Sequence, residues 1–178
     1  SDTVNVAAIG AGSMGAADIR SANQAGANIV ALCDVDDQRA AQVYRDFPDA
    51  KRYTDFRRLL DGEKNIDAVI VATPDHTHAT ITMAAMERGK HVYCEKPLAH
   101  TLYEGRMITE AARKYGVATQ LGNQGHSFKA IHEFRECIRS GAIGQVREVH
   151  AQQSAFGYSR IGALARMSDD HAVPDTLN

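Results

Sequence analysis

A glycine-rich segment at positions 10–15, with the sequence GAGSMG, restricts the possible folds more than any other part of the chain. It follows a short apolar run at 4–9, which predicts a strand, and it precedes a helical pattern at 13–25. Glycines in this spacing allow a tight turn, a close approach of the backbone to a ligand, and close packing of the helix on the strand. The sequence therefore predicts a strand–turn–helix unit with a binding site at its turn.

The predicted helix would present backbone N–H groups and the positive end of its dipole to this turn, and both attract phosphate. Because glycines also occur in ordinary turns, the motif needs support from its context. The residues of the turn that we expect to contact a ligand are Gly10, Gly12, Ser13, Met14 and Gly15.

An acidic residue in the expected position supplies that support. Asp34 ends the second apolar run, 19 residues after Gly15, which is the usual spacing for the acid that binds the adenosine ribose of a dinucleotide. A carboxylate there repels a 2′-phosphate, and Asp36 and Asp37 add negative charge, so the sequence favours NAD over NADP. Arg39 could reach a 2′-phosphate, so NADP remains the minor alternative. The alternative role for Asp34 is that of a turn or cap residue without a ligand.

Strands and helices alternate along the first 120 or so residues. The apolar runs predict strands at 4–9, 28–33, 67–72, 91–94 and 117–121. Helical patterns cover 13–25, 36–47, 55–60, 76–88 and 102–115. Short apolar strands separated by helices predict a parallel sheet covered on both faces, which is a doubly wound α/β Rossmann fold.

The pattern changes after this region, and we place a domain boundary there. Residues 1–124 are predicted to form the Rossmann domain, and 125–178 the incomplete beginning of a second α/β domain. Within the second part, 128–139 predicts a helix and the alternating segment 144–155 predicts a strand of a different sheet.

Two further loops should lie at the same edge of the sheet as the glycine turn, where ligands bind in this fold. One holds Thr73, Pro74 and the His76/His78 pair, and the other is the tripeptide Glu95-Lys96-Pro97. Successive helical positions point in different directions and no further ligands accompany the two histidines, so we predict no metal site. Lys96 either meets a substrate at the cofactor or forms a surface ion pair with a neighbour.

Taken together, these residues resemble the Gfo/Idh/MocA family, named for glucose–fructose oxidoreductase and inositol dehydrogenase. The matching parts are the glycine turn at 10–15, Asp34, Thr73-Pro74 with His78, Glu95-Lys96-Pro97, the run AAMERGKHVYCEKPL at 84–98, and IRSGAIG at 138–144.

The resemblance implies roles for further residues. It makes Lys96 the catalytic lysine and places His78, Glu95, Pro97, Asn123 and Gln124 at the cofactor cleft. The C-terminal domain of the family has a large open sheet that binds substrate and often forms an oligomer interface. The family's later aspartate and histidine have no counterpart in this chain, so the chain by itself is expected to be inactive.

The predicted function is an NAD-dependent oxidoreductase that transfers hydride between NAD and a hydroxyl group of a sugar or polyol. One alternative is a glycoside hydrolase that uses bound NAD for a transient oxidation, and another is a non-catalytic nucleotide-binding fragment. A homo-oligomer is expected for a full-length form.

Composition limits the other possible partners. The net charge of −2 and the absence of any basic run argue against nucleic acid, and no apolar stretch is long enough to cross a membrane. Cys33 and Cys94 end apolar runs and are predicted to be buried thiols, which suits a reducing cytoplasm. Since the chain does not begin with Met, a removed export leader stays open.

Overall fold

The computed structural model describes residues 3–151. Contacts divide the chain after Asn123, and the two units are described separately. The first unit is built around a six-stranded sheet in which every neighbouring pair of strands is parallel. The strands are β1 (Asn5–Ile9), β2 (Asn28–Cys33), β3 (Lys51–Tyr53), β4 (Ala68–Val71), β5 (His91–Glu95) and β6 (Thr119–Gly122).

The order of the strands determines where a ligand can enter. They run β3-β2-β1-β4-β5-β6, so the chain winds outward from β1 in one direction and then from β4 in the other. Loops that leave β1 and β4 therefore diverge, and a crevice opens between them at the carboxyl ends of the strands. This confirms the predicted doubly wound Rossmann fold.

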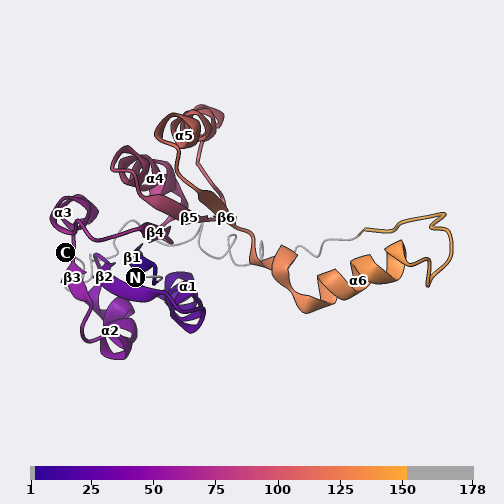
Figure 1. Cartoon of the computed structure of the whole chain (residues 1–178), viewed down its shortest axis with the longest axis horizontal. Coiled ribbons are helices and arrows are strands. Elements are labelled where there is room, and N and C mark those ends of the chain that lie inside the picture. Colours follow the sequence, from indigo (N-terminus) through magenta and orange to yellow (C-terminus); the bar gives the residue numbers. More distant parts are fainter. Residues whose placement is uncertain (1–2, 152–178) are drawn as a thin grey trace, which may run out of the picture. The chain divides into compact units, whose positions relative to one another are not determined.

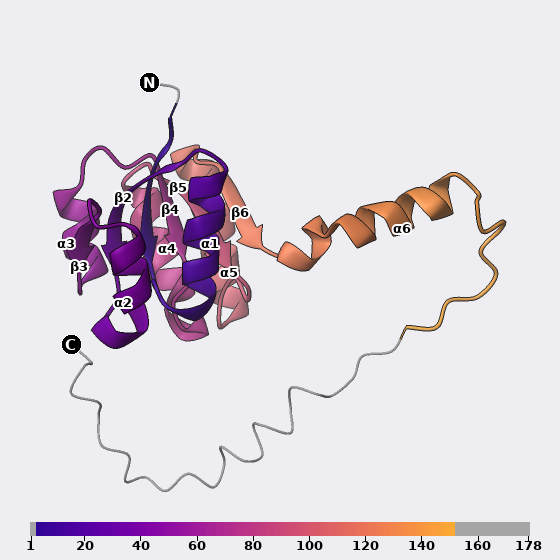
Figure 2. The same ribbon diagram turned by 90° about the horizontal axis from the view of Figure 1, so that it is seen from below.

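Helices cover both faces of the sheet (Figures 1 and 2). Helices α1 and α2 lie on one face, and α3, α4 and α5 lie on the other. The helices of this unit are α1 (Ser13–Gln24), α2 (Asp37–Asp46), α3 (Phe56–Gly62), the short 3-10 turn η1 (Asp75–Thr77), α4 (His78–Glu87) and α5 (Leu102–Tyr115).

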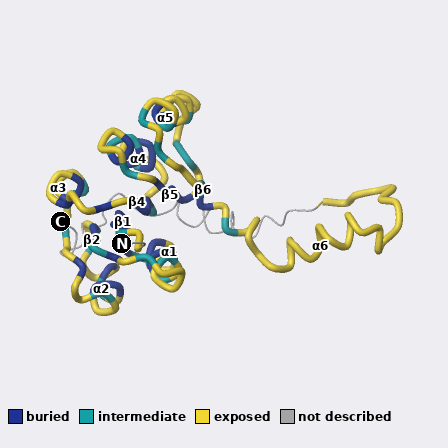
Figure 3. Tube along the Cα trace, in the orientation of Figure 1, coloured by how far each residue is buried: buried dark blue, intermediate teal, exposed yellow. Residues whose placement is uncertain are grey.

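The two central strands supply core residues to both faces. Ala7, Ile9 and Val69 pack in the cluster under α3, α4 and α5, whereas Ala8 and Ile70 pack in the cluster under α1 and α2. Both strands are buried after their first residue, and dark blue marks the buried residues at the centre of the domain in Figure 3. A strand buried on both faces needs apolar side chains at successive positions, which explains the continuous apolar runs in the sequence.

The glycine turn brings α1 against the sheet. Gly10 has a φ of 91°, and a Cβ added to it would lie 2.5 Å from the carbonyl oxygen of Ala72. A Cβ on Gly15 would collide with the carbonyl oxygen of Gly10. Gly10 therefore requires glycine because of its positive φ and the nearby carbonyl group, and Gly15 because no Cβ fits beside the Gly10 carbonyl.

The short edge strand β3 was not predicted. Its sequence, Lys51-Arg52-Tyr53, is polar and has no apolar run. The strand pairs with β2 alone, and the buried carboxylate of Glu63 accepts hydrogen bonds from Lys51 Nζ at 2.8 Å and Tyr53 Oη at 2.5 Å. These bonds hold the pKa of Glu63 below its usual value.

The second unit contains the turn η2 (Gln124–Ser127) and α6 (Lys129–Arg139), in agreement with the helix predicted at 128–139. The strand predicted at 144–155 is wrong where the structure describes it, because residues 144–151 form no strand. A strand is stable only with a partner, and none pairs with this segment in the described part of the chain. Residues 152–155 of that prediction lie outside the described residues.

A capping box begins α5. Thr101 Oγ1 accepts a hydrogen bond from the Glu104 amide at 3.2 Å, while Glu104 Oε2 accepts from the amides of Thr101 at 2.8 Å and His100 at 2.9 Å. This reciprocal arrangement satisfies backbone donors that the helix itself leaves without partners. It also fixes the point at which the loop after β5 ends.

We expect Thr101→Ala to lower the free energy of unfolding by about 1 kcal/mol and the melting temperature by about 3 °C. Thermal denaturation followed by circular dichroism measures this change. Thr109→Ala is the matched control, because the Thr109 hydroxyl is exposed and bonds only the Gly105 carbonyl within the same helix. Equal melting temperatures for the two variants would contradict a stabilising role of the box.

Candidate functional site

A cleft of about 900 Å³ opens at the carboxyl ends of the central strands. Its floor includes the ends of β1, β2 and β4, and its walls come from the first turn of α1, from α2, and from the segments that begin α3 and α4. Seven of the predicted cofactor residues line it, namely Gly10, Gly12, Ser13, Met14, Asp34, Thr73 and Pro74.

Asp34 is fixed against the glycine turn. One carboxylate oxygen, Oδ2, accepts hydrogen bonds from the amides of Ala11 at 2.7 Å and Gly12 at 3.2 Å. The other oxygen accepts from the amide of Asp36 at 3.0 Å. Hydrogen bonds from backbone amides hold a carboxylate in one orientation, so the acid and the turn form one unit at the cleft.

The beginning of α1 suits an anion. Its N-cap residue is Gly12, no side chain caps the helix, and no acidic residue lies in its first turn. By contrast, α2 and α3 are capped by the carboxylates of Asp36 and Asp55. The first turn of α1 therefore carries no carboxylate of its own, which favours an anion at the positive end of the dipole, and Asp34 bonds the Ala11 and Gly12 amides immediately before it.

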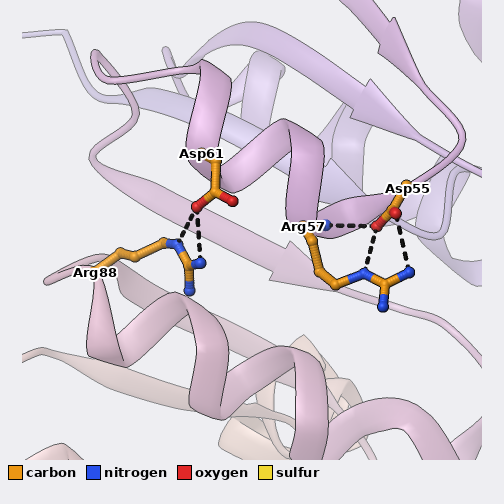
Figure 4. Close-up of polar contacts among 4 residues, drawn as sticks. All are labelled: Asp55, Arg57, Asp61 and Arg88. Carbon is orange, nitrogen blue, oxygen red and sulfur yellow. Dashed lines mark hydrogen bonds and ion pairs between the residues drawn. The ribbon is translucent and has the colours of Figure 1, made fainter.

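The wall formed by α3 is held by two pairs of charged residues (Figure 4). Asp55 accepts from the Arg57 amide and from its Nε and Nη2, each at 2.9 Å, and both residues line the cleft. At the other end of the helix, Asp61 accepts from Arg88 at 2.7 and 3.0 Å, which ties α3 to α4. The first pair thus stabilises the start of α3, and the second links α3 to α4.

The remaining predicted site residues do not line this cleft, as far as the chain is described. Lys96 and Pro97 are exposed in the loop that follows β5, whereas Glu95 is buried, and Asn123 follows β6. Gly15 and His78 are also buried, and Gln124 begins the second unit. The structure thus brings the glycine turn, Asp34 and the Thr73-Pro74 loop together at one cleft and leaves the Lys96 loop outside its lining.

A pair of carboxyl groups beneath the Lys96 loop was not predicted. Glu95 is only 4% exposed and accepts a hydrogen bond from Tyr93 Oη at 3.2 Å, and a Cβ on Gly122 would collide with its Oε1. Asp18 of α1 has a buried oxygen, Oδ2, without a hydrogen-bond partner in the described structure. Burial, and then the charge of Glu95, raise the pKa of Asp18 to about 6. No local pattern reveals this pair, because Asp18 and Glu95 are far apart in the sequence.

The cysteines and histidines give no sign of redox or metal chemistry. Cys33 and Cys94 are buried and Cys137 is exposed, and all three are free thiols. Burial, followed by the charges of Asp34 and Asp55, raises the pKa of Cys33 to about 12, so this thiol is not reactive. Residues 3–151 contain no cluster of three His, Cys, Asp or Glu side chains suited to a metal ion. They also contain no helix with the length and apolar character that a membrane span requires.

The parallel sheet, the glycine turn and the acid at the end of β2 define a dinucleotide-binding Rossmann domain. Residues 4–123 match the model of the oxidoreductase family with an NAD-binding Rossmann fold, Gfo/Idh/MocA. The chain belongs to this family, as the resemblance of its motifs predicts. NAD is accordingly the cofactor that the family assigns to this domain, and the geometry of the turn fits it.

Known relatives agree with this assignment. The chain is 35% identical to inositol 2-dehydrogenase 2 of Saccharopolyspora erythraea over 159 residues, which are 88% of this chain and 47% of the relative. Among solved structures, myo-inositol 2-dehydrogenase of Lactobacillus plantarum superimposes with a TM-score of 0.75 at 26% identity, over 82% of this chain and 43% of that one. An NAD-binding oxidoreductase of Klebsiella pneumoniae gives 0.69 at 32% identity, over 80% and 40%. The chain thus spans about half the length of the curated relatives it matches.

We expect Asp18→Asn to raise stability at pH 7–8, because the folded pKa of about 6 lies above the ordinary value of 3.8 and ionisation therefore costs free energy in the folded state. The gain should be about 1 kcal/mol, since the group is only partly buried, and it should vanish as the pH falls towards 4. Urea denaturation at a series of pH values measures it.

Asp46→Asn is the control of opposite sign. Hydrogen bonds from Gln42 and Arg20 lower the pKa of Asp46, so its carboxylate stabilises the fold above its unfolded pKa and loses that effect as the pH falls through the folded one. A destabilised Asp18→Asn at pH 8, or a gain independent of pH, would refute the assignment.

Proposed function

We propose that the protein is an NAD-dependent oxidoreductase that transfers hydride between NAD and a hydroxyl-bearing carbon of a sugar or polyol. The observation that carries the proposal is the convergence of the glycine turn, the start of α1 and Asp34 on one cleft at the reversal of the strand order. The relatives named as inositol 2-dehydrogenases support a polyol as substrate.

The cleft suggests how this chain would hold the cofactor. The amides at the start of α1 would receive the pyrophosphate, and Asp34 would accept hydrogen bonds from the adenosine ribose hydroxyls. Thr73 and Pro74, which follow β4, extend the lining away from Asp34 and suit the nicotinamide half. The negative charges of Asp34 and Asp36 oppose a 2′-phosphate, which favours NAD over NADP although Arg39 also lines the cleft.

Lys96 is the residue proposed to handle the proton. NAD, when bound, takes up the hydride. Lys96 would hydrogen-bond the substrate hydroxyl and accept or relay its proton. Its exposed position in the loop after β5 leaves the side chain accessible to a substrate. Glu95 is buried and accepts a hydrogen bond from Tyr93 Oη, so its role would be to orient this loop.

The other partners follow from the same proposal. The substrate would be a small molecule, and the complete protein would act as a homo-oligomer, without nucleic acid or membrane as partner. Buried free thiols at Cys33 and Cys94 support a reducing compartment such as the cytoplasm.

Calorimetric titration of this chain with NAD tests the cofactor proposal directly. Asp34→Ala should weaken NAD binding by about 10- to 100-fold, because hydrogen bonds to a charged carboxylate are lost, and it should reduce the preference over NADP. Asp49→Ala, at an exposed aspartate outside the cleft lining, is the control and should bind NAD as the original chain does. Unchanged binding by Asp34→Ala would remove Asp34 from the site.

Lys96→Met in a full-length form should lower kcat by at least about 100-fold, since a general acid–base group typically contributes that much, while the affinity for NAD stays within a few-fold. Steady-state rates of polyol oxidation measure the first quantity and NAD titration the second. Lys64→Met, at an exposed lysine outside the cleft lining, should leave both unchanged. Retained turnover in Lys96→Met would exclude the catalytic role.

A further inference from the structure

His78 connects the two loops that the proposed function places at the reacting end of the cofactor. It is the first residue of α4 and its side chain is 1% exposed. Its Nε2 lies 2.7 Å from the carbonyl oxygen of Thr73, in the loop after β4. Its Nδ1 lies 2.6 Å from the carbonyl oxygen of Pro97, in the loop after β5.

Both contacts are made to backbone carbonyl oxygens of loops that take part in the proposed function. Thr73 lines the cleft, and Pro97 follows the proposed catalytic Lys96 directly. The Thr73 side chain is held as well, because Thr77 Oγ1 donates to Thr73 Oγ1 at 2.7 Å and lies 2.8 Å from the Pro74 carbonyl oxygen. The imidazole therefore bridges the loop after β4, which contains Thr73, and the loop after β5, which contains Lys96.

The chemistry of imidazole suits such a bridge. Carbonyl oxygens only accept hydrogen bonds, and each ring nitrogen donates one when it carries a proton. A neutral imidazole carries only one N–H, so both bonds form together only when both ring nitrogens carry a proton, and the rigid ring then fixes the two carbonyl oxygens relative to each other. An aliphatic side chain of similar size would fill the same space without fixing either loop.

We propose that His78 is a positioning residue, which sets the place of Lys96 relative to the cofactor cleft by holding Thr73 and Pro97 through its two ring nitrogens. This inference rests on the proposed function and goes beyond it. His78 would then act on the cofactor through these loops and not by touching it, which agrees with its burial and with its absence from the described lining of the cleft.

Two amide variants separate the halves of the bridge. The amide nitrogen of Asn lies where Nδ1 lies, so His78→Asn keeps a donor towards Pro97, and His78→Gln keeps one near Nε2 towards Thr73. In amide NMR spectra of the chain without ligand, His78→Gln should perturb Lys96 and Leu98 and leave Thr73 and Thr77 nearly unchanged. His78→Asn should do the reverse, and His78→Ala should perturb both loops.

Kinetics of a full-length form distinguish the bridge from a packing role, because a packing role would not change kcat and the KM for NAD separately. His78→Gln should lower kcat by about 10-fold or more with the KM for NAD within a few-fold, because the Lys96 loop alone is released. His78→Asn should raise the KM for NAD and spare kcat. Lys64→Met, at an exposed lysine outside both loops and the cleft lining, is the control for both measurements.

The outcomes separate this inference from the proposed function. Equal perturbation of both loops by the Asn and Gln variants, or lowered melting temperatures without any loop-specific change, would overturn the bridge. If His78→Ala does not fold, the two amide variants carry the test. Failure of the chain to bind NAD would overturn the proposed function alone, because the NMR comparison is made without cofactor.

Discussion

The contact of the glycine turn with the end of β4 is the constraint on which the site depends. Gly10 approaches the Ala72 carbonyl so closely that no side chain fits between them, and Gly15 lets α1 begin against the Gly10 carbonyl. These contacts place the first turn of α1 over the reversal of the strand order. Asp34 then joins the turn through the Ala11 and Gly12 amides. The start of α1, proposed to bind phosphate, and Asp34, proposed to bind the ribose, thus share one cleft because the backbone is packed without intervening side chains.

Polar groups beneath the loops extend this arrangement to the proposed reacting end. His78 lies between the loops after β4 and β5. Glu95, which precedes Lys96, is buried, whereas Asp18 of α1 is partly buried and has one buried carboxylate oxygen. Buried polar groups are costly unless they are paired, so their presence there calls for a function that apolar residues would not serve. Holding exposed loops in a defined position on a rigid sheet is such a function.

Local patterns predicted most of the fold, and they failed where stability comes from distant partners. The apolar run at 28–33 and the pattern at 102–115 match β2 and α5 at both ends, because burial and helix periodicity are visible in the sequence itself. The polar strand β3 escaped prediction, since it depends on β2 and on Glu63. The alternating apolar and polar residues at 144–155 gave a wrong strand prediction for the same reason, because such a segment forms no strand without a partner strand.

The site divides in the same way. Gly10 and Asp34 were predictable because their spacing is a property of the turn, whereas the effect of Glu95 on Asp18 joins residues that are far apart in the sequence. A crystal structure of the chain grown with NAD is the most direct test of this site. The pyrophosphate should lie on the amides at the start of α1, with Asp34 bonded to the adenosine ribose. A dinucleotide bound elsewhere, or Asp34 turned away from it, would disprove the proposed binding mode.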